Sequence, residues 1–72
     1  MVKQIEVKNF TDVKSILAAA MLCYDEIGVH DEDGRIADAK SILGLMSLNY
    51  NHPVMIVSEN EAELHRVCEA LN

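Results

Sequence analysis

The period of the apolar residues changes along the chain, and this change constrains the fold more than any other feature of the sequence. Ile5 and Val7 stand two residues apart with charged residues beside them, which is the period of a half-buried strand. Past Asn9 the apolar residues recur at helical spacing: Val13, Ile16, Leu17, Ala20, Met21 and Tyr24. We therefore expect a strand over residues 2–8 and a helix that is capped by Asn9 or Thr11 and runs to about Cys23.

The middle of the chain carries a hairpin signal. Ile27 and Val29 alternate before an Asp-Gly pair at positions 33 and 34, and Ile36 follows the pair. Glycine accepts a positive φ without steric cost, so an Asp-Gly pair between short alternating runs predicts two antiparallel strands and a tight turn. A β-branched run, "VMIVS", follows Pro53 and predicts another short strand.

Two further helices complete the pattern. One lies within the segment from Asp38 to Tyr50, "DAKSILGLMSLNY", and the other begins with Ser58 and Glu61, which have the spacing of a capping box. Leu64, Val67, Cys68 and Leu71 then follow at i, i+3, i+4 and i+7. The order β-α-β-β-α-β-α predicts an α+β domain with one four-stranded antiparallel sheet, three helices on one face and solvent on the other.

Composition narrows the class of protein. The 72 residues suffice for one small domain, and 50% of them are hydrophobic, as in a globular chain. Six basic and twelve acidic side chains give a net charge of -6, which repels nucleic acid and anionic lipid. No apolar run approaches the roughly 18 residues of a membrane span and the N-terminus is unlike a signal peptide, so we expect a cytoplasmic protein. Cys23 and Cys68 fit the apolar faces of helices, as reduced core thiols do.

The segment from Asp38 to Tyr50 has more apolar surface than a short helix can hide. Ser41 stands where the helix should begin, and its hydroxyl can cap a free backbone N–H group. Five apolar residues follow: Ile42, Leu43, Leu45, Met46 and Leu48. They exceed the apolar stripe of a surface helix, so some of them must be exposed. Gly44, a poor residue for a helix interior, would allow the close approach of a neighbour or a partner.

The same segment resembles a known family. "ADAKSILGLMSL" is similar to "NAKSIMGVMSL" of HPr, the histidine-containing phosphocarrier of bacterial sugar phosphotransferase systems. The likeness continues in order and spacing through the first strand, the "NFT" before the first helix, the hairpin glycine seven residues before Ser41, and the last strand and helix. It implies the HPr-like open-faced sandwich. In that family a histidine at the start of the first helix accepts a phosphoryl group from enzyme I, and an arginine two residues later helps to stabilise it.

The chain departs from the family where the phosphoryl group would be held. The family pattern is G-L-H-A-R-P, whereas this chain has "DVKSIL", so Lys14 occupies the histidine position, Ile16 the arginine position and Leu17 the proline position. Neutral imidazole is a good nucleophile at about pH 7, but a solvated lysine is protonated, so Lys14 should not carry a phosphoryl group. The three histidines, at positions 30, 52 and 65, fall in the hairpin, in the loop before the last strand and in the last helix.

Two kinds of site follow from the resemblance. Ser41 resembles the serine that a dedicated kinase phosphorylates in HPr of many Gram-positive bacteria, and a helix N-terminus tolerates both a serine cap and a phosphate. Ile42, Leu43 and Met46 match the family's exposed apolar docking patch. We therefore expect a non-enzymatic regulatory or scaffolding protein that uses this helix to bind protein partners, such as phosphotransferase-system proteins or an HPr kinase.

Other interpretations stay open at this point. The chain could be a phosphocarrier or regulator that is phosphorylated at Ser41 or at an unexpected residue, or a plain structural domain, and an exposed apolar patch leaves self-association open. The run "HDEDG" lacks the ligand spacing of a calcium loop, so we expect neither a metal nor a cofactor. Lys14 and Ser15 are adjacent and point about 100° apart on a helix, which argues against a lysine-activated serine nucleophile.

Overall fold

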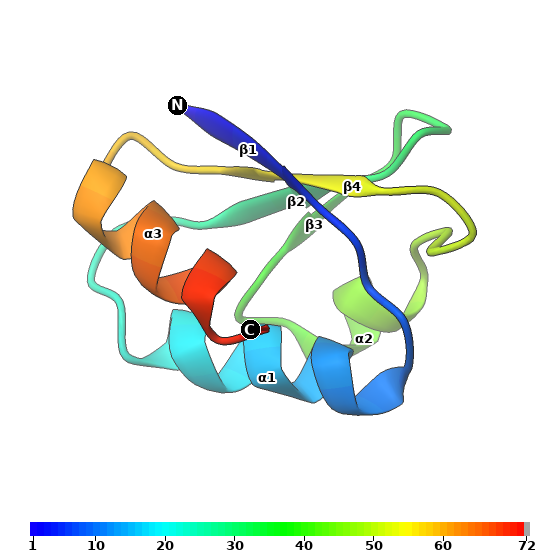
Figure 1. Cartoon of the computed structure of the whole chain (residues 1–72), viewed down its shortest axis with the longest axis horizontal. Helices are drawn as coiled ribbons and strands as arrows, with labels where there is room; N and C mark the ends of the chain where they lie inside the picture. Colours follow the sequence, from blue (N-terminus) through cyan, green and yellow to red (C-terminus); the bar gives the residue numbers. More distant parts are fainter. Residues whose placement is uncertain (72) are drawn as a thin grey trace.

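The helices and strands follow one another in the order that the sequence predicts. In the computed structural model, which describes residues 1–71, they are β1 (Val2–Ile5), α1 (Phe10–Met21), β2 (Gly28–His30), β3 (Ile36–Asp38), α2 (Ile42–Met46), β4 (Val54–Val57) and α3 (Glu61–Glu69). The strands form one antiparallel sheet in the order β1-β4-β2-β3. The helices all lie on the same side of this sheet (Figure 1). The expected α+β class and element order are therefore confirmed.

The register of the strands decides which side chains face the helices. Val29 of β2 pairs with Ala37 of β3 and with Ile56 of β4, and all three side chains are buried. Ile16 of α1 and Val67 of α3 are buried completely in the same core cluster. Each large apolar side chain removed from water contributes about 1.5–3 kcal/mol. The layer between sheet and helices is therefore the main source of stability.

The predicted hairpin is present, and its glycine is needed for the turn. Gly34 has a φ of 85°, which residues with a side chain rarely adopt, and its N–H donates to the Asp31 carbonyl oxygen at 3.2 Å. The strands on either side are β2 and β3. The turn therefore fixes the register of this pair, as the Asp-Gly signal indicates.

The first helix ends earlier than its apolar pattern suggests. The spacing places Met21 and Tyr24 on the buried stripe, but their side chains are 63% and 98% exposed. Leu22 is the C-cap, so the chain has left the helix before Tyr24 and helical spacing no longer applies to it. Ala19 and Cys23 are buried instead of Met21 and Tyr24. Cys23 lies two residues after the end of α1 and not within the helix.

The first strand is also shorter than predicted. β1 ends at Ile5, which pairs with Val54, the first residue of β4. Pro53 precedes Val54 and has no N–H to donate to a neighbouring strand. Residues 6–8 therefore continue past the end of the ladder, although Val7 is still buried against the core.

The start of α3 corrects the predicted capping box. Asn60, and not Ser58, is the N-cap, because the Asn60 side chain accepts the N–H of Glu63 at 3.1 Å. The Ser58 hydroxyl instead accepts the Asn60 N–H at 3.0 Å and donates to the Asn60 carbonyl oxygen at 3.3 Å. Ser58 thus shapes the turn that leads into the helix.

A buried carboxylate ties α3 to the loop after α1. Glu63 is only 6% exposed, and its two carboxylate oxygens accept the backbone N–H groups of Tyr24 at 2.8 Å and Asp25 at 3.0 Å. These bonds join segments that are 38 and 39 residues apart in the sequence. A charged acceptor strengthens such bonds, so Glu63 holds the loop between α1 and β2 in place.

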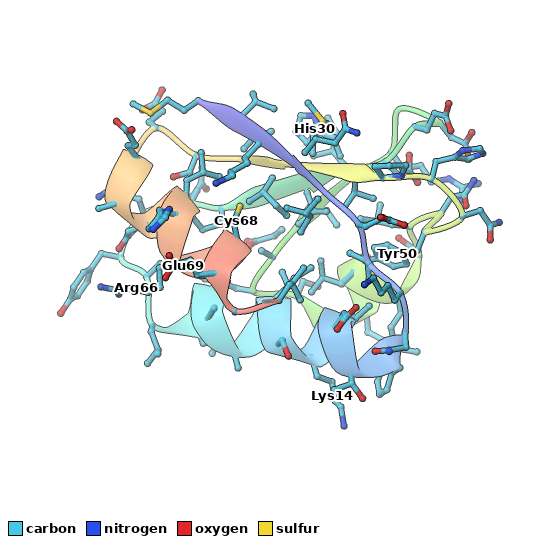
Figure 2. The ribbon with its side chains drawn as sticks, in the orientation of Figure 1. Lys14, His30, Tyr50, Arg66, Cys68 and Glu69 are labelled. Atoms are coloured by element: carbon cyan, nitrogen blue, oxygen red, sulfur yellow. The ribbon has the colours of Figure 1, made fainter. Side chains whose placement is uncertain are left out.

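The two cysteines are free thiols, and both are buried. Burial raises the pKa of the Cys23 thiol, and it raises the pKa of the Cys68 thiol in the same way. Cys68 lies between the sheet and the helices (Figure 2).

Within residues 1–71, no helix has the length and apolar character that crossing a bilayer requires.

Candidate functional site

The short helix α2 is built by a serine cap and a close contact with the sheet. Ser41 is its N-cap, and the Ser41 hydroxyl oxygen accepts the N–H of Gly44 at 3.2 Å. A Cβ placed on Gly44 would lie 3.3 Å from the Cβ of Ala37 in β3, which is tighter than an ordinary contact. Glycine at this position therefore lets α2 pack directly on β3, and the close neighbour that the sequence indicated is Ala37.

This packing divides the apolar residues of the segment into two groups. Leu45 is buried completely and Leu48 is 7% exposed, so both belong to the core. Leu43 is 80% exposed and Met46 is 58% exposed. Ile42 is half-buried and packs against the core. Of the three residues that the resemblance singles out, Leu43 and Met46 are thus free to meet a partner, and Ile42 is committed in part to the fold.

A shallow groove next to Met46 extends the exposed surface onto α1. It has a volume of about 350 Å³ and is lined by Val7, Lys8, Asn9, Phe10, Val13, Met46, Tyr50 and Asn51. Phe10, in the first turn of α1, is 51% exposed. Leu43 and Met46 are three residues apart and share one side of α2. We call Phe10, Leu43 and Met46 the α2 patch.

Tyr50 anchors the groove to the end of α2. Its hydroxyl donates to the carbonyl oxygen of Leu45, which also accepts the backbone N–H of Leu48 at 3.3 Å. Burial raises the pKa of Tyr50 to about 12, and the negative charge of Asp31 acts in the same direction. The phenol therefore stays neutral and hydrogen-bonded under physiological conditions, and the wall of the groove is held in one geometry.

Asp31 fastens the hairpin to the segment after α2. Its carboxylate accepts the N–H of Arg35 at 2.9 Å and the N–H of Asn49 at 2.9 Å. The bond from Asn49 is the main reason why the pKa of Asp31 is lowered. The Arg35 guanidinium in turn donates to the Ser47 carbonyl oxygen at 3.2 Å. The acidic run "HDEDG" thus serves the turn, and residues 1–71 contain no group of three side chains suited to a metal ion.

The N-terminus of α1 is closed by its own residues. Asn9 caps the helix by accepting the N–H of Asp12 at 3.0 Å, and the Asp12 carboxylate accepts the N–H of Lys8 at 2.9 Å. The helix begins at Phe10, so Lys14 is its fifth residue and lies beyond the first turn. The histidine position of the resembling family is therefore not at the start of this helix, where free N–H groups would attract a phosphate.

The side chains around that position are also unsuited to hold a phosphoryl group. Lys14 is exposed, and its ammonium lies 5.3 Å from the centroid of the Phe10 ring, within the range of a cation–π contact. Ile16, at the arginine position, has no exposed surface. Ser15 donates its hydroxyl to the Thr11 carbonyl oxygen at 3.0 Å and therefore points back along its own helix.

The three histidines lie on other elements. His30 is on the side of the sheet away from the helices, whereas Lys14 points out from α1 on the opposite side of the molecule (Figure 2). His65 is exposed, and its Nε2 lies 2.7 Å from a carboxylate oxygen of Glu69. The ring of His52 is 2.9 Å from the carboxylate of Glu32. None of them is placed to take over the acceptor position at Lys14.

Two members of the site were not predicted from the sequence. Phe10 precedes Val13, and the sequence indicated Asn9 or Thr11 as the cap there, so Phe10 was given no role in the helix. Tyr50 sits in a polar stretch that the sequence indicates only as a loop. An aromatic residue directly after a helix cap was the one local signal for Phe10.

Comparisons with family models, with curated proteins and with solved structures found no match to the chain.

Proposed function

We propose that this chain is an HPr-like protein-interaction domain that binds partner proteins through the α2 patch and relays no phosphoryl group through histidine. The observation that carries the proposal is the exposure of Leu43 and Met46, at 80% and 58%, on a helix whose Leu45 is fully buried. The cap at Ser41 and the close contact at Gly44 hold the backbone of the five-residue helix that presents these side chains. Binding then requires little ordering of the domain itself.

The resemblance of the segment around Ser41 supplies the class of partner. The protein would act in the cytoplasm, as a regulator or scaffold and not as an enzyme, with enzyme I or an HPr kinase as its partner. The α2 patch joins two aliphatic side chains to the aromatic ring of Phe10, and exposed groups of this kind mark interaction sites. Met46 adds an unbranched side chain that adapts to the contours of a partner.

Loss of the phosphoryl relay is supported by the surroundings of Lys14. The position lacks a histidine, lies beyond the first turn of α1, and has the buried Ile16 where the family has arginine. A phosphoryl group there would find neither free N–H groups nor a guanidinium. A protein that keeps the docking helix and lacks the acceptor can bind the same partners without passing phosphate onward.

Calorimetry with matched variants tests the docking. Enzyme I and the HPr kinase of the same organism are titrated with the parent, with the double variant Leu43→Asp, Met46→Asp, and with the single variant Met21→Asp. Met21 is 63% exposed at the far end of α1, about 16 Å along the helix from Phe10, so its variant controls for one added surface charge. We expect the double variant to lose about 30-fold or more in affinity and the control to bind like the parent. Absence of saturable binding by the parent to either protein would overturn the proposal.

A second candidate function is regulatory phosphorylation of Ser41, which its position as the N-cap of α2 favours. Phosphate at a helix N-terminus is favoured by the dipole, so the modification leaves the helix intact and adds charge beside the α2 patch. Mass spectrometry after treatment with an HPr kinase and nucleotide should show one phosphate on the parent and none on Ser41→Ala. An unmodified parent would rule out this function and would leave the docking proposal untouched.

A further inference from the structure

The side of the sheet that faces away from the helices is more apolar than a solvated face requires. The register places eight residues on it, in two rows that cross the strands in the order β1-β4-β2-β3. One row is Val2, Val57, Gly28 and Asp38, and the other is Gln4, Met55, His30 and Ile36. We call these eight residues the open sheet face.

Exposure confirms that nothing in the described chain covers this face. Val2 is 54% exposed and Ile36 is 69% exposed, while Met55 and Val57 between them are half-buried by their neighbours. Gly28 has no side chain, and the imidazole of His30 lies beside it, with Nε2 3.6 Å from the point where a Cβ would be. Figure 2 shows His30 on this outer side of the sheet. Four of the eight residues on this face are therefore apolar side chains, and the face is hollowed over Gly28.

Both ends of the open sheet face are acidic. A hollow of about 880 Å³ over Gly28, His30, Val57 and Asp38 is lined further by Asp25, Glu26, Glu59 and Glu61. At the hairpin end, a second hollow of about 280 Å³ next to Gln4 and Met55 is lined by Asp31, Glu32 and His52, with the His52 ring 2.9 Å from the Glu32 carboxylate. Neither hollow has a lysine or an arginine among the described residues that line it.

The nearest basic side chains are directed elsewhere. Lys3 is paired with Ile56, whose side chain is buried among the helices, so Lys3 is on the helix side of β1. Arg35 precedes Ile36, and its guanidinium donates to Ser47 at the end of α2. The open sheet face thus combines apolar side chains with acidic side chains at both ends.

We propose that the open sheet face binds a basic amphipathic helix of a partner protein. Charge complementarity selects this occupant: an apolar stripe covers Val2, Met55 and Ile36, and lysine or arginine residues beside the stripe meet the acidic rim. A second copy of the chain would bring two acidic rims together on a protein whose net charge is already -6. A sheet with an apolar face is completed by a layer of helix, as its other face is in this fold.

The dimensions suit one short helix. Strands lie about 4.8 Å apart, so each row of four residues spans roughly 14 Å, the length of about ten helical residues. The open sheet face and the α2 patch are on different sides of the molecule, because α2 lies on the helix side of the sheet (Figure 1). Two partners can therefore be bound at once, and this proposal does not rest on the function proposed for α2.

A designed peptide provides the probe. One peptide carries leucine along one side of a helix and lysine along the other, and a second has glutamate in every lysine position. Each is titrated into the ¹⁵N-labelled full chain while amide shifts are recorded. We expect saturable shifts with the lysine peptide at the residues of the open sheet face, and at least about tenfold weaker binding of the glutamate peptide.

Two sets of variants locate the binding. Ile36→Thr, Val57→Thr keeps β-branched residues in the strands while removing apolar surface, and Asp38→Asn, Glu59→Gln removes charge from the rim. Each pair of substitutions should weaken binding of the lysine peptide by about tenfold. The double variant Leu43→Asp, Met46→Asp should bind this peptide like the parent. Absence of shifts up to about 1 mM peptide, shifts confined to α2, or equal binding of the two peptides would overturn the proposal. Concentration-dependent dimerisation through this face, seen by sedimentation, would also overturn it by showing a second copy as the occupant.

Discussion

Replacing Ile16 by arginine, the residue that the resembling family has at this position, should unfold the domain or nearly so. Ile16 has no exposed surface and lies in the core cluster between α1 and the rest of the fold. In the sequence, the substitution restores one residue of the phosphoryl site of the resembling family. In this structure it would direct a guanidinium into the apolar core cluster.

The magnitude follows from two costs. Loss of the burial of Ile16 costs about 1.5–3 kcal/mol, and an unpaired charge in the interior costs several kcal/mol more. A domain of 72 residues has a total stability of roughly 4–11 kcal/mol. We therefore expect the free energy of unfolding to fall by at least about 4 kcal/mol, which is between roughly a third and all of the stability of the domain.

Urea denaturation followed by circular dichroism measures this loss, and Lys14→His is its matched control. Lys14 is exposed and its ammonium lies over the Phe10 ring, so the control should stay within about 0.5 kcal/mol of the parent. The control should also gain no acid-labile phosphoryl group from enzyme I and labelled phosphoenolpyruvate. An Ile16→Arg variant that unfolds within about 1 kcal/mol of the parent would refute the placement of Ile16 in the core.

Three further predictions concern buried polar groups. Tyr50→Phe should lower the free energy of unfolding, measured in urea at neutral pH, by about 1 kcal/mol. Because folding raises the pKa of Tyr50 from 10.0 to about 12, the parent should lose this contribution as the pH rises from 10 towards 12. A Tyr50→Phe variant with the same alkaline loss of stability would contradict the raised pKa of Tyr50. Folding lowers the pKa of Asp31, so the contribution of Asp31 to stability is complete above about pH 3.8 and is lost as the pH falls further. Thermal melts of Asp31→Asn should lack this loss of stability in acid. The same loss in the variant as in the parent would argue against the lowered pKa of Asp31. Since burial raises the pKa of the Cys23 and Cys68 thiols, iodoacetamide should label both at least about tenfold more slowly in the native chain than in urea, as mass spectrometry can measure, and equal rates would show that the thiols are accessible.

Local patterns were sufficient to predict the fold class but not every element end. The hairpin and the cap at Ser41 depend on neighbouring residues alone, and both have the predicted form. The capping box at Ser58 was wrong because Asn60 competes for the same N-terminus, and a spacing rule cannot rank two capping residues that lie so close together. Glu63 was missed since its partners, in the loop after α1, are far away in the sequence.

The candidate site was predictable in outline only. Counting apolar residues showed that some of the segment after Ser41 must be exposed, but the choice of Leu43 and Met46 depends on the contact between Gly44 and β3. The open sheet face was expected to be solvated, and alternation alone did not show that Val2 and Ile36 would gather there. Their proximity follows from the strand order, which brings β1 beside β4 and β2 beside β3.

Docking through the α2 patch is the central claim, and an amide-shift titration of the ¹⁵N-labelled chain with the HPr kinase of the same organism tests it most directly. The proposed contact predicts that the largest shifts fall at Phe10, Leu43 and Met46, and that signals from Ile36 and Met55 on the opposite side of the sheet stay in place. Shifts centred on the open sheet face, or an unchanged spectrum at saturating kinase, would contradict it.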